Sequence, residues 1–102
     1  METKFTPGPW TFSETDMRDT FPYKVIQQSS KYLLAKVEDR YTKTVAEALS
    51  NTRLIAAAPE MYEALLAAES QLVYLEEKYP KNGSTATVLS NIRTVLAKAE
   101  GK

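Results

Sequence analysis

Alternating apolar and polar positions dominate the first part of the chain. Residues 10–13, Trp-Thr-Phe-Ser, alternate as a half-buried strand does, and residues 22–27 and 32–37 have a similar strand-favouring composition. The polar run 28–31 between the last two segments is typical of a turn. Because connections this short cannot form parallel crossovers, the pattern predicts a three-stranded antiparallel meander within residues 1–40.

Apolar residues recur every three to four positions from residue 44 onward, which predicts helices. Thr44 and Glu47 have the spacing of a capping box, in which the Thr side chain accepts from the third helical N–H and the Glu side chain reaches back. Pro59 has no backbone N–H to donate, so we expect the first helix to kink or end there. Ala, Leu and Glu then favour a long helix up to the breaker cluster at residues 80–83.

The predicted fold class is therefore α+β, with the meander followed by a short helix and a C-terminal antiparallel helical hairpin. We expect the short helix at residues 44–58 and the hairpin helices at 59–79 and 84–100, with Ser84 or Thr85 capping the last one. Domains usually have roughly 100 to 150 residues. A chain of 102 residues is thus expected to form a single domain, 1–102.

One helical segment is apolar on too many sides for one neighbour to cover. Leu72, Val73, Tyr74 and Leu75 are consecutive apolar residues, and at about 100° per residue they surround most of a helix. Either the meander covers the remaining side or another copy of the chain does. Because small domains often complete their cores by association, we expect a homo-oligomer.

The composition restricts the possible functions. Thirteen Lys and Arg balance thirteen Asp and Glu, so we expect no broad nucleic-acid binding and no attraction to an anionic membrane. No stretch approaches the roughly 20 apolar residues of a membrane span, which predicts a cytoplasmic protein. The chain has no Cys and no His, which excludes thiolate nucleophiles, His-based triads and the usual zinc sites. We expect no enzymatic activity, no cofactor and no metal.

Two segments together resemble a known family. Thr6-Pro7-Gly8-Pro9-Trp10 near the start, followed by the run Asn-Thr-Arg-Leu-Ile-Ala-Ala-Ala-Pro-Glu at residues 51–60, is similar to small bacteriophage and prophage proteins that share a TPGPW-like start and such a helix. The resemblance implies a phage-encoded accessory protein, acting in the cytoplasm of an infected bacterial host. Many phage proteins of this size and source act against host defence, and several sequester nucleotide second messengers.

Five residues are candidates for contact with a ligand: Trp10, Tyr41, Lys43, Asn51 and Arg53. An Arg guanidinium near an amide can bind a phosphate or a base edge. Alternatively, Arg53 pairs with an acidic side chain and Asn51 hydrogen-bonds to loop backbone. Two positions apart on a helix, they lie about 200° apart, so at most one contacts a given ligand unless that ligand sits between subunits.

The other three candidates also have two interpretations. Trp10 could be a stacking surface for a base, or a core residue between sheet and helix. Tyr41 and Lys43 precede a predicted helix N-terminus, where exposed N–H groups favour anions, or they belong to a solvated loop.

The leading hypothesis is a non-enzymatic, oligomeric, phage-encoded protein that sequesters a small anionic ligand, such as a nucleotide immune signal. The alternative is an interaction module that inhibits a host defence protein through the apolar and aromatic surface of its helical hairpin.

Overall fold

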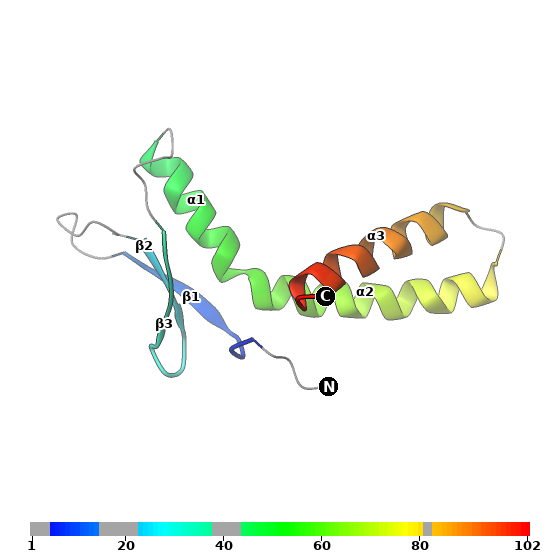
Figure 1. The fold of residues 1–102 in the computed structure, drawn as a ribbon, viewed down its shortest axis with the longest axis horizontal. Helices are drawn as coiled ribbons and strands as arrows, with labels where there is room; N and C mark the ends of the chain where they lie inside the picture. The colour runs from blue at the N-terminus through cyan, green and yellow to red at the C-terminus, as the bar shows by residue number, and fades with distance from the viewer. Residues whose placement is uncertain (1–4, 15–22, 38–43, 81–82) are drawn as a thin grey trace. The chain divides into compact units, whose positions relative to one another are not determined.

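The structure is a computed structural model that describes residues 5–14, 23–37, 44–80 and 83–102. Figure 1 shows the order of the elements along the chain. They are β1 (Trp10–Glu14), β2 (Tyr23–Gln27), β3 (Leu33–Val37), α1 (Val45–Ala56), α2 (Ala58–Lys78) and α3 (Gly83–Ala99). The predicted α+β fold, with three strands before the helices, is confirmed.

The chain divides into two compact units. Phe5–Glu60 forms the first, which we call the sheet unit, and Met61–Lys102 forms the described part of the second, the hairpin unit. The boundary falls within α2, so the first turn of that helix belongs to the sheet unit. Whether the two units behave as the single domain expected from the length stays a prediction.

The strands form one antiparallel sheet in the order β1-β2-β3. Phe12 lies opposite Val25 in the register, and Val25 lies opposite Ala35, so these side chains share one face. That face is the buried one, because Val25 is fully buried whereas its neighbours along β2 are half-exposed or lie at the strand end. The predicted turn follows β2, where Lys31 adopts a left-handed backbone conformation (φ 63°).

Helix α1 packs on the sheet through small side chains. Its buried residues are Ala48, Thr52 and Ala56, which are spaced four apart and therefore line one face. Ala48 lies in a core cluster with residues of β2 and β3. Val45 and Ile55, larger apolar residues of the same helix, are exposed. Small side chains occupy the contact instead, because they let the helix backbone approach the sheet closely.

The start and end of α1 follow the sequence signals. The Thr44 hydroxyl accepts a hydrogen bond from the Glu47 backbone N–H at 3.0 Å, as the capping box requires. The helix ends at Ala56, two residues earlier than expected, and the Ala57 N–H bonds to Arg53 O and Leu54 O. Pro59 then lies in the first turn of α2, where its missing N–H leaves no helical bond unmade.

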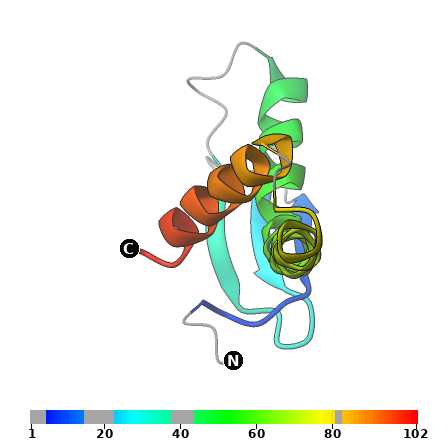
Figure 2. The same cartoon turned by 90° about the vertical axis from the view of Figure 1, so that its right-hand side faces the viewer.

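The hairpin unit consists of two helices that run in opposite directions. The Arg93 Nε and Glu69 Oε2 atoms are 3.3 Å apart, and the Tyr62 hydroxyl hydrogen-bonds to Glu100, which fixes an antiparallel register. Figures 1 and 2 show α3 crossing α2 at an angle rather than lying along it. The expected hairpin is therefore present, with a slanted crossing.

The start of α3 differs from the prediction. The helix begins at Gly83, so Ser84 and Thr85 lie inside its first turn and neither is the cap. A glycine costs little at the first position of a helix compared with the interior. The breaker cluster therefore ends one residue earlier than its composition indicates.

Candidate functional site

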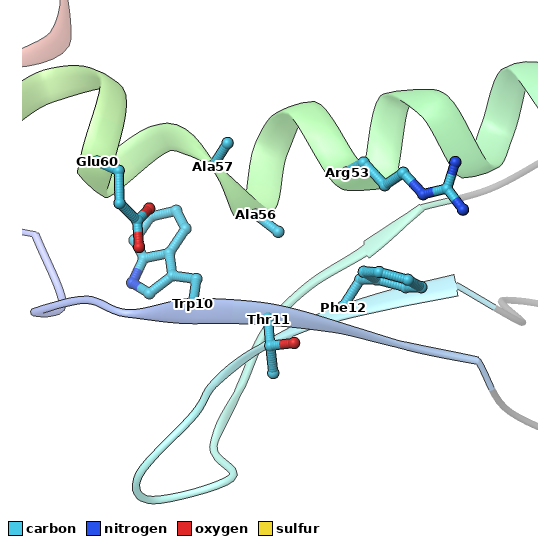
Figure 3. A pocket seen from close by; sticks show the side chains of 7 residues that line it. All are labelled: Trp10, Thr11, Phe12, Arg53, Ala56, Ala57 and Glu60. Carbon is cyan, nitrogen blue, oxygen red and sulfur yellow. The ribbon is translucent and has the colours of Figure 1, made fainter. Parts of the chain in front are cut away.

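A pocket of about 340 Å³ opens between β1 and the junction of α1 with α2, entirely within the sheet unit. Figure 3 shows its lining from close by. The residues that line it are Trp10, Thr11, Phe12, Arg53, Ala56, Ala57 and Glu60. We call this site the β1–α1 pocket. Its volume lies at the lower end of the range for small-molecule sites.

Strand alternation positions one wall of the pocket. Trp10 and Phe12 are two residues apart on β1, and both rings point toward the helices, whereas Thr11 points to the other side (Figure 3). This is the alternation predicted for residues 10–13. Between the two rings lies the methyl group of Ala56, a residue too small to fill the space. The pocket exists because a small helix residue stands opposite two aromatic ones.

Arg53 forms the positive end of the pocket. Its guanidinium carbon lies 5.6 Å from the centroid of the Phe12 ring, a cation–π distance. The residue is exposed, and no carboxylate in the described ranges forms an ion pair with it. An acidic partner, the alternative interpretation of Arg53, is therefore not found in that part of the chain. Stacking on a ring face leaves the N–H groups at the guanidinium edge available to an acceptor.

Trp10 is held in a fixed orientation. Its indole Nε1 donates a hydrogen bond to Thr6 O at 3.0 Å, and its ring meets Phe5 edge-on at 6.3 Å between centroids. The residue is half-buried between β1 and the helices, so it combines features of both interpretations. It packs between sheet and helix, and it also leaves part of its surface in the pocket.

The two segments that carry the family resemblance meet beside this pocket. The Cα of Gly8 packs so closely on Pro59 that a Cβ at position 8 would lie 2.8 Å from the Pro59 Cβ. Residues 5–9, which we call the lead-in, are held by two further hydrogen bonds. The Gln27 side-chain amide donates to Pro7 O and the Gln28 N–H donates to Pro9 O, both at 3.0 Å. The lead-in and the helix junction thus hold Trp10 and Glu60 on opposite walls of one pocket.

Glu60 is the charged residue of the pocket that was not predicted from the sequence. It lies in the first turn of α2, seven positions after Arg53, and its carboxylate stands beside the Trp10 ring (Figure 3). Seven residues are about two helical turns, so the spacing itself placed both charges on one side of the helices. The prediction overlooked the signal because Pro59 separates the two residues into different helices.

The remaining candidates are not brought into this pocket. Asn51 is exposed on α1 and is absent from the lining, as expected from its angular separation from Arg53. Tyr41 and Lys43 lie outside the residues that the structure describes. Of the five predicted site residues, the structure therefore places Trp10 and Arg53 together.

Two further features concern ligands and membranes. Within the described ranges, no three acidic side chains gather as they would to hold a metal ion. None of the helices in those ranges is both long enough and apolar enough to span a bilayer.

Comparison with known proteins identifies the family. Residues 1–102 match the family described as Salmonella phage P22 protein Y8K6. The chain belongs to this phage protein family. The match covers the whole chain, so the sheet unit and the hairpin unit are both family features. No curated protein and no solved structure matches the chain. The family match thus supports the bacteriophage origin that the two sequence segments implied.

Proposed function

We propose that this Y8K6-family protein is a non-enzymatic, oligomeric binding protein that sequesters a small anionic ligand. The leading candidate is a nucleotide signal of the host's immune response. One observation carries the proposal: an exposed arginine and two aromatic rings line the same pocket. A guanidinium binds phosphate oxygens through paired hydrogen bonds, and an aromatic face stacks on a base.

The two charged residues of the pocket give the ligand a direction. Arg53 stands beside Phe12 at one end, and Glu60 stands beside Trp10 at the other. At a helical rise of about 1.5 Å per residue, the seven positions from Arg53 to Glu60 cover about 10 Å along the helices. A phosphate is favoured at the arginine end and is repelled at the glutamate end. A base stacked on Trp10 could donate an amino hydrogen to the Glu60 carboxylate.

The pocket contacts one side of a ligand, since it is open to solvent. In an oligomer, a neighbouring copy would supply the other side. Asn51 stays a candidate for that contribution, because it does not line the pocket of its own chain. Tyr41 and Lys43 lie outside the described residues and stay candidates from the sequence alone.

Calorimetric titration with a panel of cyclic and linear nucleotides tests the proposal. We expect binding at micromolar concentrations, and we expect Arg53→Gln to raise the dissociation constant at least about tenfold, since a charge-assisted hydrogen bond contributes about 1.5 to 3 kcal/mol. Arg93→Gln is the matched control, because it removes the same charge from an exposed residue in the hairpin unit.

The outcomes separate the possible results. Absence of binding to every nucleotide in the panel contradicts the proposal. Equal weakening by Arg53→Gln and Arg93→Gln contradicts the assignment of the pocket. If Asn51→Ala and Arg53→Gln each weaken nucleotide binding, the ligand lies between two copies, because Asn51 does not line the pocket of its own chain.

The second candidate function is inhibition of a host defence protein by direct binding. It is favoured by the exposed apolar and aromatic side chains of the hairpin unit, which include Tyr74, Leu75 and Tyr79. Purification from host lysate distinguishes the two functions. Inhibition by this surface is supported if a host protein co-purifies stoichiometrically with the wild type and is lost with the Tyr74→Glu variant.

A further inference from the structure

Each helix of the hairpin unit carries an apolar stripe in addition to the residues between the helices. The members recur at alternating steps of three and four, as residues on one side of a helix do. The stripe on α2 is Met61, Leu65, Ala68, Leu72 and Leu75, and the stripe on α3 is Val88, Ile92, Val95 and Ala99.

These stripes lie on the same side of the hairpin. The contacts of Tyr62 with Glu100 and of Glu69 with Arg93 mark the side of each helix that faces the other. At about 100° per residue, both stripes are rotated from that side by roughly a quarter turn, in the same sense about each helix's own direction. For antiparallel helices, rotation in the same sense leads to the same side. We call the combined surface the apolar face.

Within the hairpin unit, the two helices leave the apolar face exposed. Met61, Leu75, Val88 and Val95 are 47%, 39%, 47% and 52% exposed. None of its nine residues carries a charge. A contiguous apolar surface of this kind is uncommon on a protein that stays monomeric.

The hairpin unit has little core of its own. Among its described residues, the large apolar side chains that are buried are Tyr62, Leu89 and Leu96. The ion pair of Arg93 with Glu69 also joins the helices, but the Arg93 side chain is exposed, so it adds little to a core. Because most helical stability comes from burial of an apolar face, two helices with so few buried residues need another surface.

We infer that a second copy of the chain packs on the apolar face, so that the four hairpin helices of a symmetric dimer share one core. A seventeen-residue helix is about 25 Å long and about 10 Å wide, so the two crossing helices offer at most about 500 Å² of apolar face per copy. The total, about 1,000 Å², is at the lower limit for a biological interface, which is the size expected of a weak dimer.

The chemistry of the face favours a copy of itself over another partner. A symmetric interface places the same patch on both subunits, so any charge in the patch would meet a like charge near the axis. The apolar face has no such charge to bury. The inference is independent of the proposed ligand, because the face and the β1–α1 pocket share no residue.

Sedimentation equilibrium of the full chain tests the inference, with adjacent residues as test and control. Leu75 lies on the apolar face, whereas Tyr74 is exposed on the opposite side of α2. We expect the wild-type chain to dimerise, Leu75→Glu to raise the dimer dissociation constant at least about tenfold, and Tyr74→Glu to change it little. Val95→Glu provides the same test on α3.

Circular dichroism of each variant shows whether the helices still form. A wild-type chain that stays monomeric at every concentration overturns the inference. So does a dimer that Tyr74→Glu weakens as much as Leu75→Glu does. Leu75→Glu could lose the dimer and the helices together. This result supports the inference if the helix content of the wild type rises with protein concentration. It contradicts the inference if the helix content of the wild type is constant.

Discussion

Gly8 shows how one residue links distant parts of this sequence. It lies in the proline-rich lead-in, yet its nearest neighbour outside the lead-in is Pro59, about fifty positions later. An added Cβ would come within 2.8 Å and 3.3 Å of two Pro59 atoms, and a proline ring cannot move away by a rotamer change. The residue is therefore required for close approach rather than for an unusual backbone angle.

We predict that Gly8→Ala destabilises the sheet unit. Overpacking of this kind costs about 1 to 3 kcal/mol, which should appear as a lower midpoint in chemical denaturation. Gly83→Ala is the control, because nothing lies within 4 Å of a Cβ at that position. Equal stability of Gly8→Ala and the wild type would show that the lead-in does not pack on Pro59.

The Arg53 side chain contacts an aromatic ring rather than a carboxylate among the described residues. From the sequence it could have paired with an acid, but its recorded contact is the face of Phe12. Such a contact orients the guanidinium without neutralising it. As far as the described residues show, the charge thus remains available to a ligand.

Among the elements, the hairpin helices are joined by polar contacts as well as apolar ones. Burial raises the pKa of Tyr62 above its usual value of 10.0, and the nearby Glu100 and Glu69 carboxylates raise it further. The folded chain therefore keeps this proton at a pH where the unfolded chain has lost it. The associated stability is complete below pH 10.0 and falls as the pH rises above that value.

We predict that Tyr62→Phe flattens this dependence. Above about pH 10, the wild type should lose stability more steeply with rising pH than the variant does. At neutral pH the variant should be less stable than the wild type, because the hydrogen bond to Glu100 is lost. Denaturation curves followed by circular dichroism measure both effects, and parallel pH profiles would contradict the role of Tyr62.

The elements themselves were largely predictable, because their signals are local. Alternation located the strands, and Thr44 and Pro59 located the ends of α1 to within two residues. The packing face of α1 was not predictable in the same way, since Ala48 and Ala56 look unremarkable in the sequence. Their burial depends on how closely the helix meets the sheet, which no local pattern records.

The candidate site was predictable only in part for a related reason. Trp10 and Arg53 were identified by residue type, but their meeting depends on contacts across more than forty positions. Glu60 was missed because its role arises from that same long-range packing.

At the scale of the whole molecule, the balanced charge gives no general attraction for a polyanion. The chain has a formal net charge of zero, and the pocket itself holds one positive and one negative side chain. Recognition of a ligand therefore has to come from placement of individual groups rather than from a general field. A small ligand with separated donor and phosphate groups suits this arrangement better than a long polyphosphate does.

The position of Trp10 has a practical consequence for the entire chain. It is the single tryptophan of the sequence, and it lines the proposed binding pocket. A base stacked on its ring should quench its fluorescence, whereas a ligand bound elsewhere should leave the emission unchanged. We predict a saturable quench that Arg53→Gln shifts to higher nucleotide concentration, measured by titration in a fluorimeter. Unaltered emission at a nucleotide concentration that saturates binding in calorimetry would place the ligand away from Trp10. The single tryptophan thus reports whether the pocket is occupied.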